Sequence, residues 1–310
     1  MKHLVIVNQK SGKGRCPVCF AKSIDEAFKG LDYEVYNTTG PKSAISFLKD
    51  YFAKHTDETV RVYACGGDGT LHEVVNGLIG VKNAELAIMP VGTGNDFVKI
   101  YGGVDKFKDF KASIEAKAHP VDVTKLSSDS LKEPLYSINV INFGFDAIVG
   151  AMGNYYKEVG VPEKAKKKGM DPYDYALKND AMKHGRFNDI EVYADGEKLN
   201  EKQMLLCTLA QGQFVGGKFH CAPKSDNTDG LIDVCLIKTM TFLGLGLIIG
   251  TYTKGKHLNR KRKKIVYRQA KQIKIVAPKD IDICIDGEMI KGNNFTAEVV
   301  PGAINLVVPE

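Results

Sequence analysis

The sequence predicts two unlike folds in succession, an α/β domain over residues 1–123 and a mainly antiparallel β domain over residues 124–302. Strand-like apolar runs alternate with helix-like segments as far as Asp122, and after it strand-like runs follow one another without regular helices. Alternation of strands and helices is typical of a parallel sheet, whereas successive short strands separated by turns favour a β-sandwich. Three glycine-rich loops in the first part each follow a predicted strand.

Composition limits the class of protein. The chain has 310 residues, 44% of them hydrophobic and 26% charged, which is typical of a soluble globular protein. Its seven cysteines and the lack of an apolar N-terminal segment predict a cytoplasmic protein without a disulfide framework. The longest apolar run, Phe242 to Thr253, is too short to span a bilayer.

The central loop is Cys65–Thr70, which follows the predicted strand Val60–Ala64 and precedes the predicted helix Leu71–Leu78. Glycines and a helix N-terminus together allow backbone N–H groups to face an anion. Thr70 is the expected N-cap, with Glu73 completing a capping box. Asp68 would repel a bare phosphate, so its natural partner is a divalent cation carried by that phosphate. The alternative is a tight turn with a surface aspartate.

Two further loops have the same position relative to their strands. Lys2–Val7 is followed by Asn8 and a basic glycine turn that is neither a Walker A loop nor a Rossmann fingerprint. The predicted strand Leu86–Pro90 is followed by the glycine loop Val91–Phe97, which also contains an acid, Asp96. Ligands of a parallel sheet gather at the carboxyl ends of its strands, so one crevice is expected to collect all three loops and bind a nucleotide.

Cys16 and Cys19 have the spacing of a redox motif or of half a zinc site. No second pair of comparable spacing exists to complete a zinc site. We interpret them as ordinary thiols at the start of a helix, with a redox effect on the neighbouring loop as the alternative.

The β domain is predicted from a series of strand-like runs, which are Tyr136–Ile141, Ile190–Ala194, Met204–Ala210, Leu231–Ile237, Gln272–Val276, Ile281–Ile285 and Phe295–Val300. Helical interruptions are expected near Tyr155–Lys183, as a charged and exposed flap, and near Phe242–Tyr252. Turn signals such as Asp286-Gly287 separate several of the strands.

One segment makes the protein basic. Lys254–Lys279 holds eleven Lys and Arg residues and no acid, so the remainder of the chain is net negative although the whole carries +6. Such a patch indicates an anionic surface, unless it is merely a solvated hairpin. A nucleic-acid platform would need interleaved aromatic residues, and the segment has only Tyr267.

With these motifs in hand, the chain resembles the diacylglycerol kinase catalytic family, in its bacterial lipid-kinase branch. The Gly66–Thr70 loop alone is shared with NAD kinases and, in degenerate form, with sphingosine kinases. The more specific matches are Pro90–Phe97, Asn142–Ala147, Thr228–Val234 and Asp286–Glu288. The resemblance implies a Rossmann-like, phosphofructokinase-like nucleotide-binding domain at 1–123, a β-sandwich lipid-substrate domain at 124–302, and a strand within 303–310, over Ile304–Pro309, that returns to the first domain.

The resemblance also assigns roles to individual residues. For nucleotide binding it matches Asn8, Ser11, Gly12, Lys13, Gly66, Gly67, Gly69, Thr70, Glu73, Thr93 and Asn95. For the active-site Mg²⁺ it matches Asp68, Asp96 and Asp122, and for a separate structural Mg²⁺ it matches Asp229 and the Leu231 carbonyl. For catalysis it matches Asp286 as the base with Glu288 beside it, and Asp68 is the alternative base.

The chain departs from the family pattern in three places. Gln9 replaces a proline, which is expected to loosen the first loop, and Asn227 and Thr228 stand where an extra acid is usual, which argues against the structural Mg²⁺. The Cys16/Cys19 pair is not a family feature.

The expected function is therefore that of an ATP- and Mg²⁺-dependent kinase that phosphorylates a hydroxyl of a membrane lipid, with diacylglycerol as first choice. The alternatives are an NAD kinase and a non-catalytic nucleotide- or membrane-binding regulator. We expect peripheral attachment to the inner face of the membrane through Lys254–Lys279 and the preceding apolar run Phe242–Ile249. We expect no nucleic-acid partner, and a homodimer stays open.

Overall fold

The computed structural model describes residues 1–310 apart from residues 15, 202 and 260–262, and apart from the side chains of residues 13–21. The Cys16/Cys19 side chains, the side chain of Lys13 and part of the predicted basic segment therefore lie outside the described residues.

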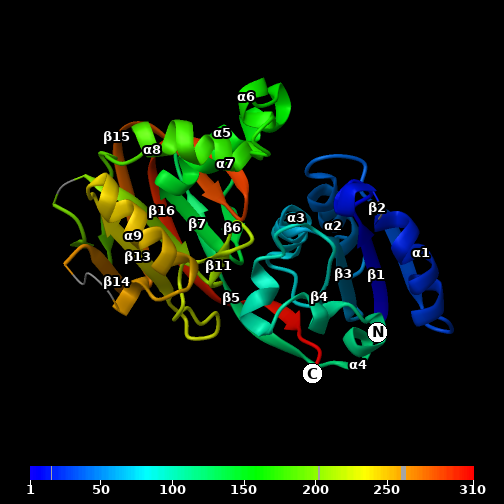
Figure 1. The fold of residues 1–310 in the computed structure, drawn as a ribbon. Helices are drawn as coiled ribbons and strands as arrows, with labels where there is room; N and C mark the ends of the chain where they lie inside the picture. Colours follow the sequence, from blue (N-terminus) through cyan, green and yellow to red (C-terminus); the bar gives the residue numbers. More distant parts are fainter. Residues whose placement is uncertain (15, 202, 260–262) are drawn as a thin grey trace.

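The N-terminal part is a parallel sheet covered by helices on both faces (Figure 1). Its strands, in the order β4-β3-β1-β2, are β4 (Ala84–Pro90), β3 (Val60–Gly66), β1 (Lys2–Val7) and β2 (Tyr33–Asn37). Alternate side chains of a strand point to opposite faces. Leu4 and Ile6 accordingly join the core under α2 (Ser43–Phe52) and α3 (Asp68–Leu78), and Val5 and Val7 join the core under α1 (Cys16–Ala27) and α4 (Phe110–Glu115).

The C-terminal part is a mainly antiparallel sheet that continues the same hydrogen-bonded path. Its main strands are β5 (Ala118–Ser127), β6 (Leu135–Ser137), β7 (Val140–Gly144), β8 (Glu191–Ala194), β9 (Glu197–Lys198), β10 (Met204–Ala210), β13 (Ile232–Lys238), β14 (Ile265–Ala270), β15 (Gln272–Ile285) and β16 (Glu288–Val307). A short hairpin of β11 (Phe214–Val215) and β12 (Phe219–His220) stands apart from this sheet. The predicted fold class, α/β followed by β, is confirmed.

Two long strands connect the parts. β16 pairs with β15 at its start and with β5 further along, and at Leu306 it runs parallel to β4 opposite Leu86. The end of β16 thus lies where the resemblance implies a strand that returns to the first domain. The proposed boundaries at 123/124 and 302/303 fall inside β5 and β16, so both strands cross from one part to the other without a break.

Helices cover the C-terminal sheet where interruptions were expected. The flap consists of α5 (Phe145–Val159), α6 (Glu163–Lys166), α7 (Pro172–Ala176), a π-helical turn and α8 (Met182–His184). Helix α9 (Phe242–Thr253) packs Leu245, Ile248 and Tyr252 against β10 and β13. The flap and α9 lie on the same side of the sheet, and α6 projects furthest from it (Figure 1).

Two local predictions were wrong. Helix α3 begins at Asp68, with the backbone of Gly67 as its N-cap, so Thr70 lies inside the helix and forms no capping box. The four strands predicted between Gln272 and Pro309 are two long strands, β15 and β16. Each continues past its proline, Pro278 or Pro301, because the register of its pairing shifts there and the strand can bend without ending.

Candidate active site

The three glycine loops meet at the carboxyl ends of β1, β3 and β4, as the sequence predicts. In chain order, the first loop follows β1, the second (the central loop) follows β3 and the third follows β4. The N–H of Val91 donates to the Gly66 carbonyl at 2.9 Å, which joins the second and third loops. The amide of Asn8 donates to Thr70 Oγ1 at 2.9 Å, which joins the first loop to α3. These hydrogen bonds therefore join the three loops to one another.

Glycine is required where the second and third loops touch. A Cβ on Gly92 would lie 2.5 Å from the Gly67 Cα, which is a backbone atom that cannot swing aside. A Cβ on Gly66 would lie 2.1 Å from Thr70 Oγ1. These loops are thus pressed together backbone to backbone, and their glycines serve packing as well as access for a phosphate.

Asn95 shapes the third loop. Its side chain accepts from the Gly92 N–H at 2.9 Å and donates to the Gly92 carbonyl at 2.8 Å, and its own backbone has φ of 46°. Asparagine tolerates this left-handed conformation better than most residues. The closed turn leaves Thr93 exposed at the tip, so Thr93 is the accessible member of the predicted pair.

The first loop is a tight turn after β1. Asn8 Oδ1 accepts from the Lys10 N–H at 3.0 Å, and the Ser11 N–H donates to the Asn8 carbonyl at 3.1 Å. Gly12 has φ of +61° and faces the Val91 carbonyl, so a side chain there would be strained. This turn, which continues as a 3-10 turn over Ser11–Gly14, places Gly12 against Val91 of the third loop.

Two acids converge over Gly94. Asp68 Oδ1 accepts from the Asp96 N–H at 2.7 Å. A Cβ added to Gly94 would lie 2.7 Å from Asp68 Oδ2 and 3.4 Å from Asp96 Oδ2, so one oxygen of each carboxylate faces the same small space. Burial raises the pKa of Asp68 to about 6, and the negative charge of Asp96 adds to the rise. A cation in this space would relieve the repulsion.

Asp96 also reaches the C-terminal part. Its oxygens accept from the Gly217 N–H at 3.0 and 3.1 Å, and Lys99 Nζ lies 2.5 Å from Oδ1. Lys99 donates in turn to the Gly217 carbonyl at 2.8 Å. The turn of the β11–β12 hairpin is thereby held against the third glycine loop.

Asp286 is enclosed by donors. Its carboxylate accepts from the Ser137 hydroxyl at 2.6 Å, from three consecutive N–H groups of residues 138–140 at 3.0 to 3.1 Å, and from His72 Nδ1 at 3.1 Å. Five donors exhaust the acceptor positions of a carboxylate. His72 belongs to α3, so this cluster joins the central helix to β15 and β16.

Glu288 and Glu73 make different contacts around the central helix. The exposed Glu288 has Oε1 3.4 Å from the position of a Cβ on Gly69, so it faces the first turn of α3. Glu73 instead accepts from the N–H groups of Lys42 and Ala44 at 2.8 and 3.2 Å. Its described contacts satisfy free donors at the N-terminus of α2.

Asp122 makes contacts of a different kind from Asp68 and Asp96. It is buried, and its oxygens accept from the N–H groups of Gly230 and Gly302 at 2.7 and 2.8 Å. These bonds tie β5 to the turn before β13 and to β16. The described residues contain no group of three or more His, Cys, Asp or Glu side chains able to hold a metal, so the three predicted acids do not form one such group.

The two metal predictions therefore differ in fit. Asp68 fits as a direct ligand of Mg²⁺, because its Oδ2 faces the space over Gly94. Asp96, whose oxygens already accept from Gly217 and Lys99, fits as a ligand through water, since Mg²⁺ takes one or two protein carboxylates and keeps several waters. The proposed structural site does not fit: Asp229 accepts from the Leu231 N–H at 2.9 Å and the Gln269 amide at 2.7 Å, and the Leu231 carbonyl accepts from Gln211 at 3.0 Å. Two glutamine amides occupy the oxygens that a cation would need.

Sequence reasoning missed the residues that join the two parts at this site, namely His72, Lys99, Ser137 and Gly217. Lys99 stands three residues after Asp96, which is the spacing of neighbours on a helical turn. This was the one available signal, because the other contacts join segments far apart in the chain.

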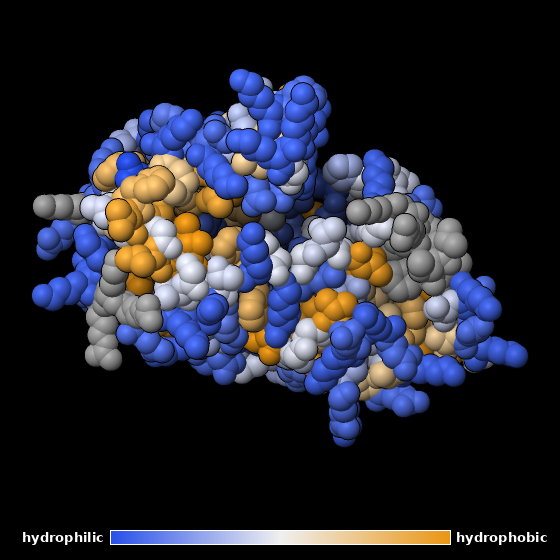
Figure 2. All heavy atoms as spheres, viewed as in Figure 1, coloured by the Kyte–Doolittle hydropathy of each residue, from blue (hydrophilic) through white to orange (hydrophobic). Residues whose placement is uncertain are grey.

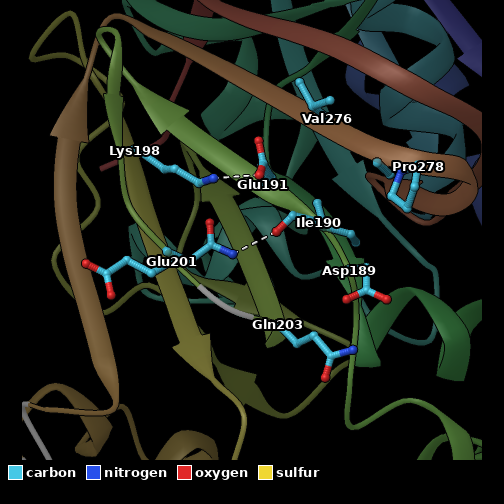
Figure 3. Close-up of a pocket in the computed structure, with 10 residues that line it drawn as sticks. Asp189, Ile190, Glu191, Lys198, Glu201, Gln203, Val276 and Pro278 are labelled. Carbon is cyan, nitrogen blue, oxygen red and sulfur yellow. Dashed lines mark hydrogen bonds and ion pairs between the residues drawn. The ribbon is translucent and has the colours of Figure 1, made fainter.

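A pocket outside this site has both polar and apolar walls. It has a volume of about 390 Å³ and lies between the β8–β9 hairpin and β15, lined in part by Asp189, Glu191 and Lys198 (Figure 3). Glu191 is already paired with Lys198 at 2.5 Å, and the hydrogen bond from Lys198 lowers the pKa of Glu191. The pocket includes no predicted site residue.

The predicted basic segment is not one surface. Lys254 and Lys256 follow the C-terminal end of α9. Lys264 donates to the carbonyl of Thr239, which precedes the N-terminal end of α9. Further along, Arg268 pairs with Glu197 at 2.6 Å, and the segment continues into β15. Residues 260–262 lie outside the described residues. No helix in the described part of the chain is long and apolar enough to cross a membrane.

Comparison with known proteins agrees with this architecture. Residues 2–126 match the model of the diacylglycerol kinase catalytic domain, and residues 139–308 match that of the YegS C-terminal NAD kinase beta sandwich-like domain. A diacylglycerol kinase of Bacillus subtilis is 27% identical over 292 residues, covering 92% of this chain and 88% of the relative. A probable lipid kinase YegS-like of Shewanella frigidimarina is 29% identical over 269 residues, covering 82% and 78%.

A solved structure of a diacylglycerol kinase from Bacillus anthracis superposes with a TM-score of 0.68 at 20% identity, over 99% of this chain and 96% of that one. This likeness supports the fold. The two family models account for nearly the whole length, and with the named relatives they show that the chain belongs to the diacylglycerol kinase catalytic family, in its bacterial lipid-kinase branch.

Proposed function

We propose that this lipid kinase transfers the γ-phosphate of ATP to the free hydroxyl of diacylglycerol, and that the reaction needs Mg²⁺. The observation that carries the proposal is the convergence of Asp68 and Asp96 over Gly94, where three glycine loops meet. Phosphoryl transfer demands positioning and neutralisation of charge more than covalent help from the protein.

The loops supply the phosphate site. The first turn of α3 offers free backbone N–H groups at a helix N-terminus, and an anion is stabilised there. The exposed Thr93 and the turn around Gly12 lie beside it. Asp68 and Asp96 would hold Mg²⁺, which when bound offsets phosphate charge and orients the triphosphate.

Asp68 is the better candidate for the proton acceptor. One of its oxygens faces the space over Gly94, where a carboxylate within hydrogen-bond reach of the acceptor hydroxyl can take its proton. Asp286 has both oxygens engaged by five donors, which makes it a positioning residue in this proposal. Glu288, exposed beside Gly69, is assigned to the hydroxyl side of the site.

The test is transfer of label from γ-labelled ATP to diacylglycerol in mixed micelles, with and without Mg²⁺. We expect labelled phosphatidic acid only with Mg²⁺ and diacylglycerol together. NAD, phosphatidylglycerol, a polyprenol and a sphingoid base serve as competing acceptors. Phosphorylation of NAD instead would make the chain an NAD kinase, and ATP binding without transfer to any acceptor would make it a regulator.

We also propose that the enzyme meets its acceptor at an anionic membrane surface, where the Lys254–Lys279 segment contributes positive charge. Each basic side chain near such a surface contributes about 1 kcal/mol.

A further inference from the structure

Helix α9 has no polar face. Its sequence from Phe242 to Thr253 contains no charged residue. A surface helix of a globular protein normally turns charged residues to solvent, but here Phe242, Leu243 and Leu247 are 60%, 78% and 62% exposed. Single exposed apolar side chains are ordinary, whereas three on adjacent turns of one helix form a patch that calls for a partner.

Phe187 extends this face. It is 54% exposed and, with Met240 and Phe242, lines a shallow groove of about 410 Å³ beside the start of α9. Figure 2 shows hydrophobic residues gathered over α9, while most of the remaining visible surface is hydrophilic. We call Phe187, Phe242, Leu243 and Leu247 the α9 patch.

Positive charge surrounds the α9 patch. The Arg186 guanidinium lies 5.3 Å from the ring centre of Phe187 and 6.0 Å from that of Phe242, and Lys264 lines the same groove. Lys254 and Lys256 follow the other end of α9 and are exposed. The chain has no Asp or Glu between residues 233 and 280. An apolar face rimmed by cations is complementary to a bilayer that carries anionic headgroups.

The α9 patch connects to the active site through packed elements. Helix α9 packs on β12, and the turn of the β11–β12 hairpin carries Gly217, whose N–H donates to Asp96. On its buried side, the Tyr252 hydroxyl donates to Asp146 at 3.2 Å, which ties α9 to the start of α5. A bilayer that binds α9 would therefore contact a helix that packs on the β11–β12 hairpin, and this hairpin contacts Asp96 in the active site.

We propose that the α9 patch docks on an anionic lipid bilayer, with Phe242, Leu243 and Leu247 entering the acyl boundary and Arg186, Lys254, Lys256 and Lys264 meeting lipid phosphates. This docking proposal rests on the proposed function and extends it, because the acceptor lipid lies in the membrane. It replaces the continuous basic segment by a surface that combines part of that segment with Arg186 and Phe187.

The test is flotation of the full chain, without nucleotide, with phosphatidylcholine vesicles that contain or lack phosphatidylglycerol. We expect wild-type protein to bind the anionic vesicles and the double variant L243S/L247S to bind at least tenfold more weakly. L31S/V35S is the matched control, since those side chains are 41% and 43% exposed in the N-terminal part. R186Q/K264Q should weaken binding to anionic vesicles and flatten its dependence on salt.

Equal binding of L243S/L247S and wild type would overturn the proposal. So would a wild-type dimer in sedimentation equilibrium that becomes monomeric in L243S/L247S without any vesicle binding, because the patch would then join two copies of the chain. Activity on a dispersed short-chain diacylglycerol separates the two proposals. L243S/L247S should keep that activity while losing activity on vesicles, and absence of transfer in wild type would contradict the kinase reaction while leaving the vesicle result intact.

Discussion

Asp68 and Asp96 share a hydrogen bond of 2.7 Å from the Asp96 N–H to Asp68 Oδ1, and the second oxygen of each faces Gly94. Two carboxylates that are held together and partly buried repel each other. The arrangement persists because the backbone of two glycine loops fixes it and because Lys99, 2.5 Å from Asp96 Oδ1, offsets part of the repulsion. The oxygens that face Gly94 still make a place where a cation is favoured.

The first prediction concerns Asp68. Asp68→Asn should lower turnover at saturating ATP by about 10³-fold, because it removes the proposed proton acceptor and a metal carboxylate together. Stability near pH 7.5 should not fall, since burial already disfavours the charged form of this carboxyl and raises its pKa to about 6. Initial rates and urea unfolding check both parts. Turnover within a factor of ten of wild type would contradict the assigned role.

Gly92 carries the second prediction. Gly92→Ala should raise the KM for ATP more than tenfold and lower stability, because its Cβ would lie 2.5 Å from the backbone of Gly67 and must push the two loops apart. Steady-state kinetics and thermal unfolding measure the two effects. The control is Gly40→Ala, where a Cβ meets nothing within 4 Å, and it should leave the KM unchanged. A normal KM in Gly92→Ala would mean that the loops tolerate separation.

The meeting of the three loops could be predicted because it follows from one rule about parallel sheets. Each loop is marked by glycines directly after an apolar run, and the carboxyl ends of neighbouring parallel strands lie at one edge. Asn8, Gly66 and Val91 satisfy the rule together. The capping box was wrong: its residue pattern is present, but the helix begins three residues earlier than predicted, at Asp68 instead of Leu71.

The environment of each acid could not be predicted, because its partners come from distant segments. Asp286 is bonded by residues 137–140 and by His72, and these positions carry no local signal of that role. Asp229 illustrates the converse: the family pattern indicates a metal ligand, yet Gln269 and the Leu231 N–H occupy its oxygens. Motifs report which residues stand near a site, whereas hydrogen-bond partners decide what each can do.

Asp286 provides the third prediction. Asp286→Asn should destabilise the protein by about 3 kcal/mol or more, since its amide NH₂ would face buried donors and leave some of them unpaired. Glu288→Gln is the control, and at this exposed position it should change the free energy of unfolding by less than about 0.5 kcal/mol. Urea unfolding measures both. A variant Asp286→Asn of normal stability and no activity would return the role of base to Asp286.

The last prediction concerns pH and Asp233. Its side chain is fully buried, Tyr267 donates to Oδ1, and Oδ2 has no partner among the described residues. Burial raises the pKa of Asp233 to about 6, so the folded state holds a proton that the unfolded state releases near pH 4. The stability that Asp233 contributes is therefore present below about pH 4 and lost as the pH rises through 6.

Asp233→Asn should accordingly stabilise the protein at pH 8 by about 1–3 kcal/mol relative to its effect at pH 4.5, because the amide cannot ionise. Urea unfolding of variant and wild type at both pH values isolates this difference from that of the other buried acids. Asp129→Asn is the control, since that carboxyl is exposed and its substitution should act equally at both pH values. The same change in free energy for Asp233→Asn at pH 4.5 and pH 8 would show that this carboxyl ionises alike in the folded and unfolded chain.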